Sequence, residues 1–267
     1  TIGEEVERIA EVRQFLHEIN LGATAIGTRV TAAPGYPELA TKYLSELTDC
    51  KFILGSDLVE ATSDTGAYVL LSGVLKRTST KLTKICNDIR LLSSGPRCGL
   101  NEINLPQMQP GSSIMPGKVN PVIPEATVMA AAQVIGHHAA ITIAGQTGNF
   151  QLNVTLPLIA ANLLESIQLL ANVSRLLADD CIAGLRVREA RVKEALDRNP
   201  ILVTALNPVI GYEKGAAIAK QAYRQNRPVL EVAREITGLP EKTLKPLLDP
   251  AVLAKGGIHG KAGGGGG

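Results

Sequence analysis

Tryptophan is absent from the 267 residues, and all aromatic side chains together make up 3% of the chain. Proteins that bind single-stranded nucleic acid stack the bases on aromatic rings, so this scarcity argues against that class. An excess of charge of one sign is also lacking, because the formal net charge is only +2. A dedicated nucleic-acid binder carries a clustered basic excess. The composition therefore argues against RNA or DNA as a partner.

Cysteines are few and widely separated, at Cys50, Cys86, Cys98 and Cys181. The chain has no Cys-x-x-Cys pair and no histidine pair that would complete a zinc site. We therefore expect reduced, buried thiols in a cytoplasmic protein, and no structural metal. Signal-peptide features are also lacking, as are uninterrupted apolar runs of the roughly 18–20 residues that a membrane span requires. We expect no membrane partner.

Alternation typical of β-strands is nearly absent, and helical periodicity dominates what is present. Apolar residues recur at intervals of three and four along most of the first 180 residues. The pattern predicts helices over residues 2–19, 37–47, 57–94, 121–144 and 153–180. Gly95-Pro96 ends the third, and few globular helices are as long. The predicted fold class is all-α, with a bundle of long helices.

The texture of the sequence changes after Gly184, where the segments become shorter and proline and glycine more frequent. This change predicts a central helical-bundle domain over residues 1–185, truncated at its start, and a small C-terminal helical domain over 186–260. Residues 261–267 end in a glycine run, which predicts a flexible tail. The chain opens within an amphipathic pattern, as if inside a longer helix.

The most informative stretch is residues 111–121, which read Gly-Ser-Ser-Ile-Met-Pro-Gly-Lys-Val-Asn-Pro. A Gly-Ser loop here leads into a helix, where Asn120 is expected to be the N-cap and Pro121 the first helical residue. A helix N-terminus is a natural site for an anion. The stretch is not a nucleotide-binding P-loop, because the spacing between the glycines is one residue too long and Val119 replaces the required hydroxyl.

The side chains of this loop fit a carboxylate substrate. Lys118 offers a positive charge, and Asn120 and the helix amides offer hydrogen bonds. The chemistry that needs such donors is removal of a proton next to a carboxylate, because charge then develops on its oxygens. Ser112 and Ser113 supply hydroxyls, but a serine acts as a base only if amides and a cation stabilise its alkoxide. The competing interpretation is an ordinary exposed Gly-Ser loop.

The ordered string at 111–121 resembles the signature loop of the fumarase/aspartase superfamily, without departure. Four further segments, at 20–28, 60–68, 84–97 and 99–106, also resemble this superfamily, so the similarity covers most of residues 1–212. Two branches compete. Residues 61–64 and 100–106 are similar to aspartate ammonia-lyase, whereas 202–207 and 210–214 are similar to fumarase. The segments nearer the expected active site favour the first branch.

The resemblance implies roles for individual residues. Ser112 corresponds to the general base that removes the substrate's Cβ proton. Lys118 and Asn120 correspond to ligands of the carboxylate, with Ser113 and Met115 lining the loop. Glu125 corresponds to an acid that pairs with a histidine of a neighbouring subunit. The adjacent His137 and His138 match no such role and are interpreted as packed or solvated side chains.

The resemblance also implies a longer protein than this chain. Family members carry an N-terminal domain with further substrate ligands, and they assemble as homotetramers in which three subunits build each active site. The expected substrate is a small dicarboxylate, aspartate or fumarate. No cofactor is expected to be required, although a divalent cation could act as an activator. Without the missing region, the chain is expected to lack normal activity, and an inactive oligomerising fragment is a further alternative.

Overall fold

The long helices of the protein belong to the first of two structural units. The structure, a computed structural model, describes residues 1–255. Unit 1 spans Thr1–Arg186, and unit 2 begins at Val187. The expected glycine tail at 261–267, and residues 256–260 of the expected C-terminal domain, lie outside the described residues.

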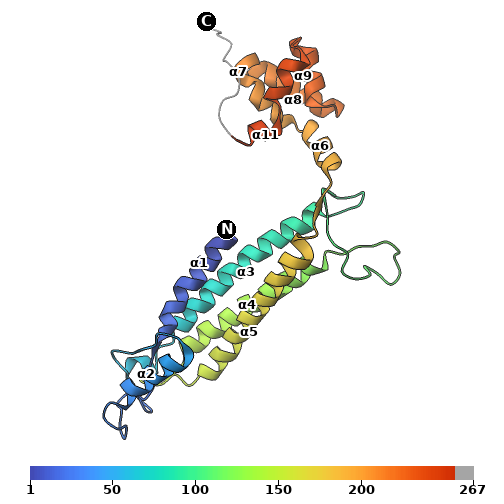
Figure 1. The fold of residues 1–267 in the computed structure, drawn as a ribbon. Helices are drawn as coiled ribbons and strands as arrows, with labels where there is room; N and C mark the ends of the chain where they lie inside the picture. Colours follow the sequence, from blue (N-terminus) through green and yellow to red (C-terminus); the bar gives the residue numbers. More distant parts are fainter. Residues whose placement is uncertain (256–267) are drawn as a thin grey trace. The chain divides into compact units, whose positions relative to one another are not determined.

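Unit 1 is built around three long helices packed in sequence order. α3 packs against α4, and α4 packs against α5, while α1 lies along α3 (Figure 1). The bounds are α1 (Ile2–Arg13), α3 (Gly66–Leu92), α4 (Val122–Gly145) and α5 (Leu156–Leu176). A 3-10 turn, Gln14–His17, extends α1, and a π-helix, Leu177–Ile182, extends α5. The described part of the chain is therefore all-α in class, as predicted.

The helices form because each buries one stripe of apolar side chains in a shared core. In α3 the buried residues Leu71, Leu75, Leu82, Cys86 and Ile89 recur at helical intervals. They meet side chains of α4 and α5 in one core cluster that includes Val134, Ile141, Ile159, Leu163 and Leu170. Burial of such a side chain is worth about 1.5–3 kcal/mol, so packing rather than local propensity stabilises these helices.

The helix predicted from residue 57 begins nine residues later, so that expectation was wrong at its start. Residues Glu60–Thr62 form a short 3-10 turn, and α3 starts at Gly66. Asp57 Oδ1 accepts hydrogen bonds from the N–H groups of Val59 and Glu60, at 2.9 and 3.2 Å. An aspartate that captures nearby backbone N–H groups stabilises a turn in place of a helix.

The remaining elements of unit 1 are short. α2 (Tyr36–Thr48) lies at the end of the bundle where α3 begins, among loops (Figure 1). The strand β1 (Glu18–Ile19) pairs in parallel with β2 (Ile53–Leu54). β3 (Ile103–Asn104) and β4 (Arg186–Val187), whose second residue already belongs to unit 2, are also only two residues long. Such short strands explain why the sequence lacked β alternation.

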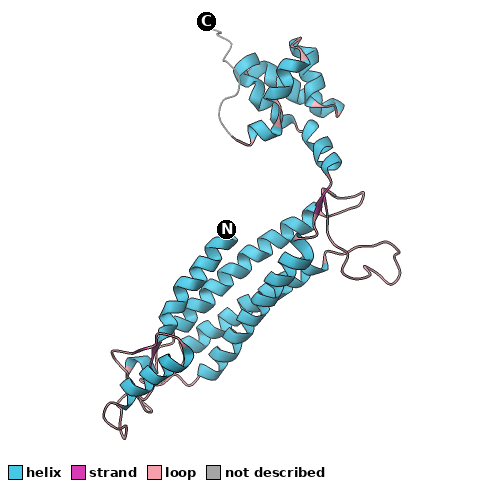
Figure 2. Cartoon of the chain, viewed as in Figure 1, coloured by secondary structure: helices cyan, strands magenta, loops and turns pink. Residues whose placement is uncertain are grey.

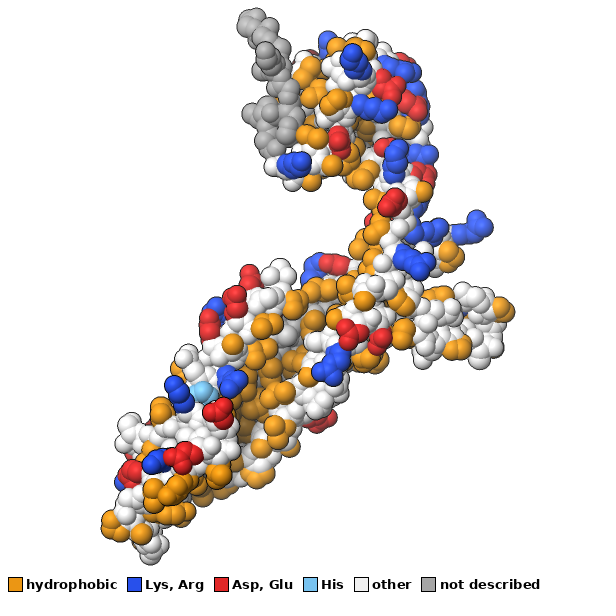
Figure 3. All heavy atoms as spheres, in the orientation of Figure 1, with side chains coloured by type: hydrophobic (Ala, Val, Ile, Leu, Met, Phe, Trp, Pro, Cys, Tyr) orange, Lys and Arg blue, Asp and Glu red, His pale blue; other side chains and the backbone are white. Residues whose placement is uncertain are grey.

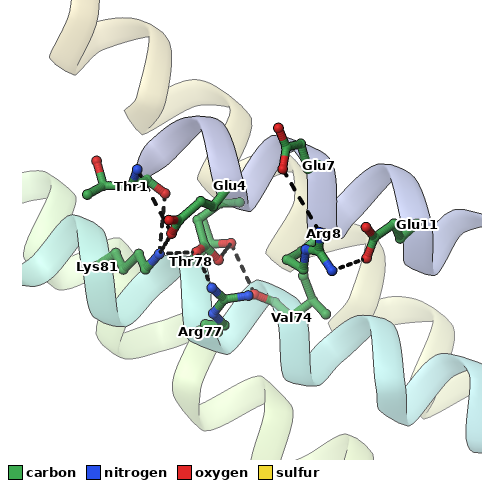
Figure 4. Close-up of polar contacts among 10 residues, drawn as sticks. Thr1, Glu4, Glu7, Arg8, Glu11, Val74, Arg77, Thr78 and Lys81 are labelled. Carbon is green, nitrogen blue, oxygen red and sulfur yellow. Dashed lines mark hydrogen bonds and ion pairs between the residues drawn. The ribbon is translucent and has the colours of Figure 1, made fainter.

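A charged cluster fastens α1 to α3 (Figure 4). Glu5 on α1 is only 1% exposed, and it forms ion pairs with Arg77, at 3.1 Å, and with Lys81 on α3. The Thr78 hydroxyl donates to Glu5 Oε2 at 3.4 Å. Glu4 pairs with Lys81 at 2.8 Å at the exposed edge of the cluster. A buried carboxylate is tolerated here because two cations and a hydroxyl surround it.

Unit 2 has a small core of its own. A 3-10 helix (Pro200–Leu206) and the helices α8 (Tyr212–Gln225), α9 (Val229–Thr237) and α10 (Glu241–Leu247) surround it. The shorter helices are α6 (Glu189–Asp197), α7 (Asn207–Ile210) and α11 (Pro250–Leu253). Leu206, Ile218, Val232 and Leu244 are fully buried in this core. The frequent prolines and glycines seen in the sequence separate these short helices.

Apolar side chains also cover the outer faces of the long helices. Figure 3 shows them along the length of the bundle. The exposed residues of α4 and α5 include Met129, Ile135, Ile143, Leu158, Leu164 and Ile167. By length and composition, α4 and Leu156–Ile182 are apolar enough to cross a membrane, with mean hydropathies of 1.3 and 1.4. The core helix of a water-soluble protein passes the same test, and both helices contribute to the bundle core.

Candidate active site

The loop singled out by the sequence extends from the end of the bundle where α3 ends. The chain between Leu92 and Val122 is irregular apart from β3, and Figures 1 and 2 show it as a long excursion. Its first part folds back on α3, because the N–H of Glu102 donates to the carbonyl of Leu92 at 2.9 Å. Residues 105–121 form the outer part, which carries the 111–121 motif.

Two contacts close the neck of this loop. Asn120 Nδ2 donates to the carbonyl of Gly111 at 2.9 Å. Gly111 also lies so close to the Lys118 carbonyl that a Cβ at position 111 would overlap with it. Glycine is therefore required there, since any side chain would force apart the two chain segments that form the neck. The neck encloses residues 112–119 in one small loop.

The hydroxyl of Ser112 lies just inside the neck and is held by backbone amides. Ser112 Oγ accepts hydrogen bonds from the N–H groups of Ile114 and Met115, at 3.2 and 3.1 Å. N–H donors stabilise an alkoxide more than a neutral hydroxyl, because hydrogen bonds to a charged acceptor are stronger. The sequence could not reveal whether amides would surround this oxygen. The loop supplies two, so it provides part of what a serine base requires.

The other loop residues proposed from the sequence face solvent. Ser113 and Lys118 are exposed, and Met115 is 48% exposed. Gly117 turns the chain with a φ of 78°, and the Lys118 N–H donates to the Met115 carbonyl at 3.3 Å. The ammonium group of Lys118 is thus accessible in the same small loop as Ser112. An accessible ammonium suits an incoming carboxylate.

The start of α4 differs from the prediction. Pro121 rather than Asn120 is the N-cap residue, and Asn120 uses its amide in the loop neck. The N–H of Val122 donates to the Asn120 carbonyl at 2.9 Å. The N–H of Glu125 donates to the Pro121 carbonyl at 3.0 Å, and Pro124 has no N–H. The first turn of α4 therefore offers few donors to an anion.

Glu125 has an arginine neighbour that the sequence did not suggest. Its Oε1 lies 3.9 Å from Nη2 of Arg90 on α3, and both side chains are partly exposed. Arg90 Nη1 in turn donates to Asn87 Oδ1 at 3.2 Å. Arg90 belongs to the segment 84–97, and the resemblance of that segment to the superfamily was the sequence signal that could have pointed to this arginine. Spacing along one helix cannot reveal a contact across two helices.

The other segments that resemble the superfamily divide between the two ends of the bundle. Residues 84–97 and 99–106 lie beside the loop, at the end of α3. Residues 20–28 and 60–68 lie at the start of α3, in the loops near α2. α3 has 27 residues. At 1.5 Å per residue its ends are about 40 Å apart, so one copy of unit 1 does not bring all these segments together.

The two adjacent histidines of α4 are packed between helices, away from the loop. His138 Nδ1 lies 2.9 Å from Ser72 Oγ on α3, and His137 Nδ1 lies 3.0 Å from Ser166 Oγ on α5. The Ser166 hydroxyl donates to the Asn162 carbonyl at 2.7 Å, so it accepts from His137. His137 is 12 positions after Glu125, about 18 Å along the helix. These histidines form a polar layer within the bundle.

The cysteines are unpaired, but only two fit the expectation of buried thiols. Cys86 and Cys181 are buried, and burial raises the pKa of each thiol. Cys50 is partly exposed and Cys98 is exposed, so the expectation was wrong for Cys98. Within residues 1–255, no group of three or more His, Cys, Asp or Glu side chains is arranged to hold a metal ion.

Two protein families match this chain. Residues 1–136 match a family described as "Lyase", and residues 202–255 match one described as "Fumarase C C-terminus". The first match alone covers half of the chain. The two matches fall in unit 1 and unit 2, respectively.

Individual relatives carry two different names. A fumarate hydratase class II of Xylella fastidiosa is 58% identical over 97% of this chain and 55% of its own length. An aspartate ammonia-lyase of Pseudomonas aeruginosa is 52% identical over 94% of this chain and 53% of its own. A solved structure described as a fumarate lyase:delta crystallin from Brucella melitensis is 47% identical, with a TM-score of 0.90 over 94% of this chain and 54% of that one. The chain thus spans about half the length of the relatives it matches.

Proposed function

The chain belongs to the fumarase/aspartase superfamily of lyases, and from this membership we propose that the whole protein removes ammonia from L-aspartate to form fumarate, reversibly. One observation carries the proposal: Ser112 Oγ is held by two backbone N–H groups in a loop whose neck is closed. A serine in that setting is prepared to act as a base, which is what the elimination requires.

In the proposed mechanism, Ser112 as an alkoxide takes the proton from the substrate's Cβ. The electron pair of the broken C–H bond moves into the adjacent carboxylate, which becomes an aci-carboxylate dianion. Lys118 stabilises that charge, because an ammonium gains more from a dianion than from the ground-state carboxylate. When the dianion collapses, the C–N bond breaks, and its electron pair leaves with the ammonia. Fumarate remains, and Ser112 returns its proton to solvent.

Asn120 and Glu125 assist this reaction without removing the Cβ proton themselves. Asn120 contributes to carboxylate binding at the loop neck, with Ser113 and Met115 lining the loop. Glu125 pairs with a histidine of a second copy, and Arg90 orients the glutamate from α3. We propose no role for a cofactor, and a divalent cation would act as an activator only. A cytoplasmic location is proposed as well.

Hydration of fumarate to L-malate is the second candidate function. The 58% identity to a fumarate hydratase, against 52% to an aspartate ammonia-lyase, favours it. The segments 61–64 and 100–106, in contrast, resemble the aspartate ammonia-lyase branch. In the direction that forms fumarate, both reactions remove a proton from the substrate's Cβ, and they differ in the leaving group, which is ammonia in one and water in the other. The role of Ser112 is therefore common to both candidates.

Assembly of several copies is part of the proposal. The segments that resemble the superfamily lie about 40 Å apart in one copy, at opposite ends of α3. Copies packed through the exposed apolar faces of α4 and α5 would bring opposite ends together in a homotetramer with composite sites. The 267 residues alone are then expected to oligomerise without normal activity.

The test uses the full-length protein with L-aspartate and L-malate as separate substrates. Fumarate absorbance follows either reaction, and ammonia release identifies the first. Replacement of Ser112 by Ala should lower kcat by about 10²- to 10⁴-fold, the usual contribution of a positioned base. The matched control is Ser113→Ala, which removes the neighbouring hydroxyl and should change kcat less than tenfold.

Three results would decide between the candidates. Ammonia release from aspartate that depends on Ser112 supports the first. Formation of fumarate from malate, with no ammonia released when aspartate is the substrate, supports the second. Turnover of either substrate that survives Ser112→Ala excludes Ser112 as the base. An additional assay of the isolated 267 residues should give no more than trace activity.

A further inference from the structure

Gly184 lies directly against the segment that enters the Ser112 loop, residues 105–108, which we call the first stem. It follows the π-helix at the end of α5. A Cβ at position 184 would lie 2.5 Å from Cγ of Pro106, with the next nearest atoms at 3.6 and 3.7 Å. Carbon atoms pack at about 3.5–4.0 Å, so a side chain at 184 would displace the proline ring. The missing side chain is what allows this approach.

The segment that leaves the loop, residues 121 and 122, is the second stem and rests on the same support. A hollow of about 10 Å³ is lined by Pro106 and Met108 of the first stem, by Pro121 and Val122 of the second, and by Asp180 and Cys181 of the π-helix. A cavity of this size holds at most one water molecule, so it is a packing contact and no ligand site. Both stems therefore meet on the π-helix.

The π-helix determines which residues face the stems. The N–H of Ala183 donates to the carbonyl of Ala178, five residues earlier, at 3.0 Å. This wide turn adds one residue to the helix, which rotates the following residues by about 100° compared with a continuous α-helix. Cys181 remains buried in the core, while Gly184 faces Pro106. Wide turns of this kind are frequent at functional sites.

The stems are connected closely to Ser112. Pro106 precedes it by six residues, and Pro121 directly follows Asn120, whose side chain closes the neck on Gly111. A displacement of Pro121 therefore reaches the neck directly, and a displacement of Pro106 reaches it within five residues. Because most of residues 113–119 are exposed, the packing at the base of the loop adds to the neck contacts in restraining where the hydroxyl lies.

We propose that the π-helix Leu177–Ile182 and Gly184 form a support that positions Ser112 for proton abstraction, with Gly184 as a positioning residue. The proposal rests on the function proposed for Ser112. Gly184 does not touch the substrate, and its contribution is the close contact with Pro106. A shift of about 1 Å in a catalytic group can cost up to 100-fold in rate, so a tight support matters.

The experiment compares three variants of the full-length protein. Gly184→Ala introduces the clash and should lower kcat about 10- to 100-fold. Pro106→Ala removes the Cγ atom and should stay within about threefold of the wild type, since the remaining contact is ordinary. The double variant, in which the added Cβ has room, should recover to within about threefold of Pro106→Ala. Gly3→Ala, where nothing lies within 4 Å of the new Cβ, controls for the substitution itself.

Hydrogen exchange of the backbone amides in residues 105–121 provides a readout independent of activity. Exchange should accelerate in Gly184→Ala and return to the wild-type rate in the double variant. Faster exchange with unchanged kcat would overturn the positioning role, as would loss of kcat that Pro106→Ala fails to rescue. If the wild type proved to have no lyase activity, the proposed function would fail, and unchanged exchange in Gly184→Ala would separately refute the support.

Discussion

Ser112 owes its chemical character to the backbone around it. A hydroxyl becomes a base when its charged form is stabilised, and in the role proposed for Ser112 the N–H groups of Ile114 and Met115, at 3.2 and 3.1 Å from its Oγ, would supply this stabilisation. Because those donors belong to the main chain, substitution of either residue by anything other than proline leaves them in place. The side chains at 114 and 115 are therefore free to serve other purposes, such as contact with the substrate.

His138 makes the stability of the bundle dependent on pH. Burial, with a smaller effect from Lys76, lowers the pKa of its imidazole below the ordinary 6.5. The folded state thus prefers neutral His138, and between the two pKa values the unfolded state binds more protons. Stability is fully present above about pH 6.5 and is lost as the pH falls through that value toward the folded-state pKa.

The measurement is urea unfolding at pH 7.5 and 5.5. The wild type should lose more stability between these values than His138→Gln, which retains a partner for Ser72 but does not titrate in this range. An equal loss in both proteins would mean that another group titrates.

At the scale of the element, the sequence predicted which helices exist better than where they begin. The apolar periodicity of α3 was clear because Leu71, Leu75 and Leu82 repeat on one face. Its start was misplaced because Asp57 captures two backbone N–H groups, a local competition that periodicity does not record. Asn120 was misassigned for a related reason: its amide has a closer partner across the loop neck. The residues that make up the candidate site could be predicted from the order of residues along the chain. The hydrogen-bond partner of each side chain could not.

The docking of α1 on α3 depends on one buried carboxylate. Glu5→Gln should weaken this docking by about 1–3 kcal/mol, because the ion pair with Arg77 is lost while Arg77 itself remains accessible to water. Such a loss corresponds to roughly 5- to 150-fold faster hydrogen exchange at α1 amides whose protection depends on local opening.

The matched control for this prediction is Glu7→Gln. Glu7 lies on the same helix with its side chain 70% exposed. A change of no more than about 0.5 kcal/mol is expected there. Equal effects of the two substitutions would contradict a special role for the buried cluster.

At the scale of the whole molecule, the notable feature is the apolar surface that α4 and α5 expose to solvent in a single copy. Exposed apolar patches of this extent mark interaction sites in soluble proteins. The assembly proposed above gives this patch an occupant, a second copy of the chain, and burial against that copy would also explain why these helices are apolar enough to resemble membrane spans.

Leu164→Glu tests this interpretation. Leu164 on α5 is 66% exposed, and a charge there would have to be buried on assembly, so the full-length variant should dissociate to smaller species in analytical ultracentrifugation. Activity should fall in parallel, because composite sites are lost. Ile201→Glu, at a similarly exposed position in unit 2, should leave the mass unchanged. A Leu164→Glu protein with the wild-type mass would show that this face is not the interface.

The wide turn at the end of α5 has a consequence for how the sequence can evolve. One residue removed from Leu177–Ile182 would rotate Gly184 away from Pro106 by about 100°, whereas a substitution would leave the register intact. Sequence changes in this stretch should therefore be substitutions, and insertions or deletions should be rare. A lineage that gained or lost a residue there would have to rebuild the base of the Ser112 loop at the same time.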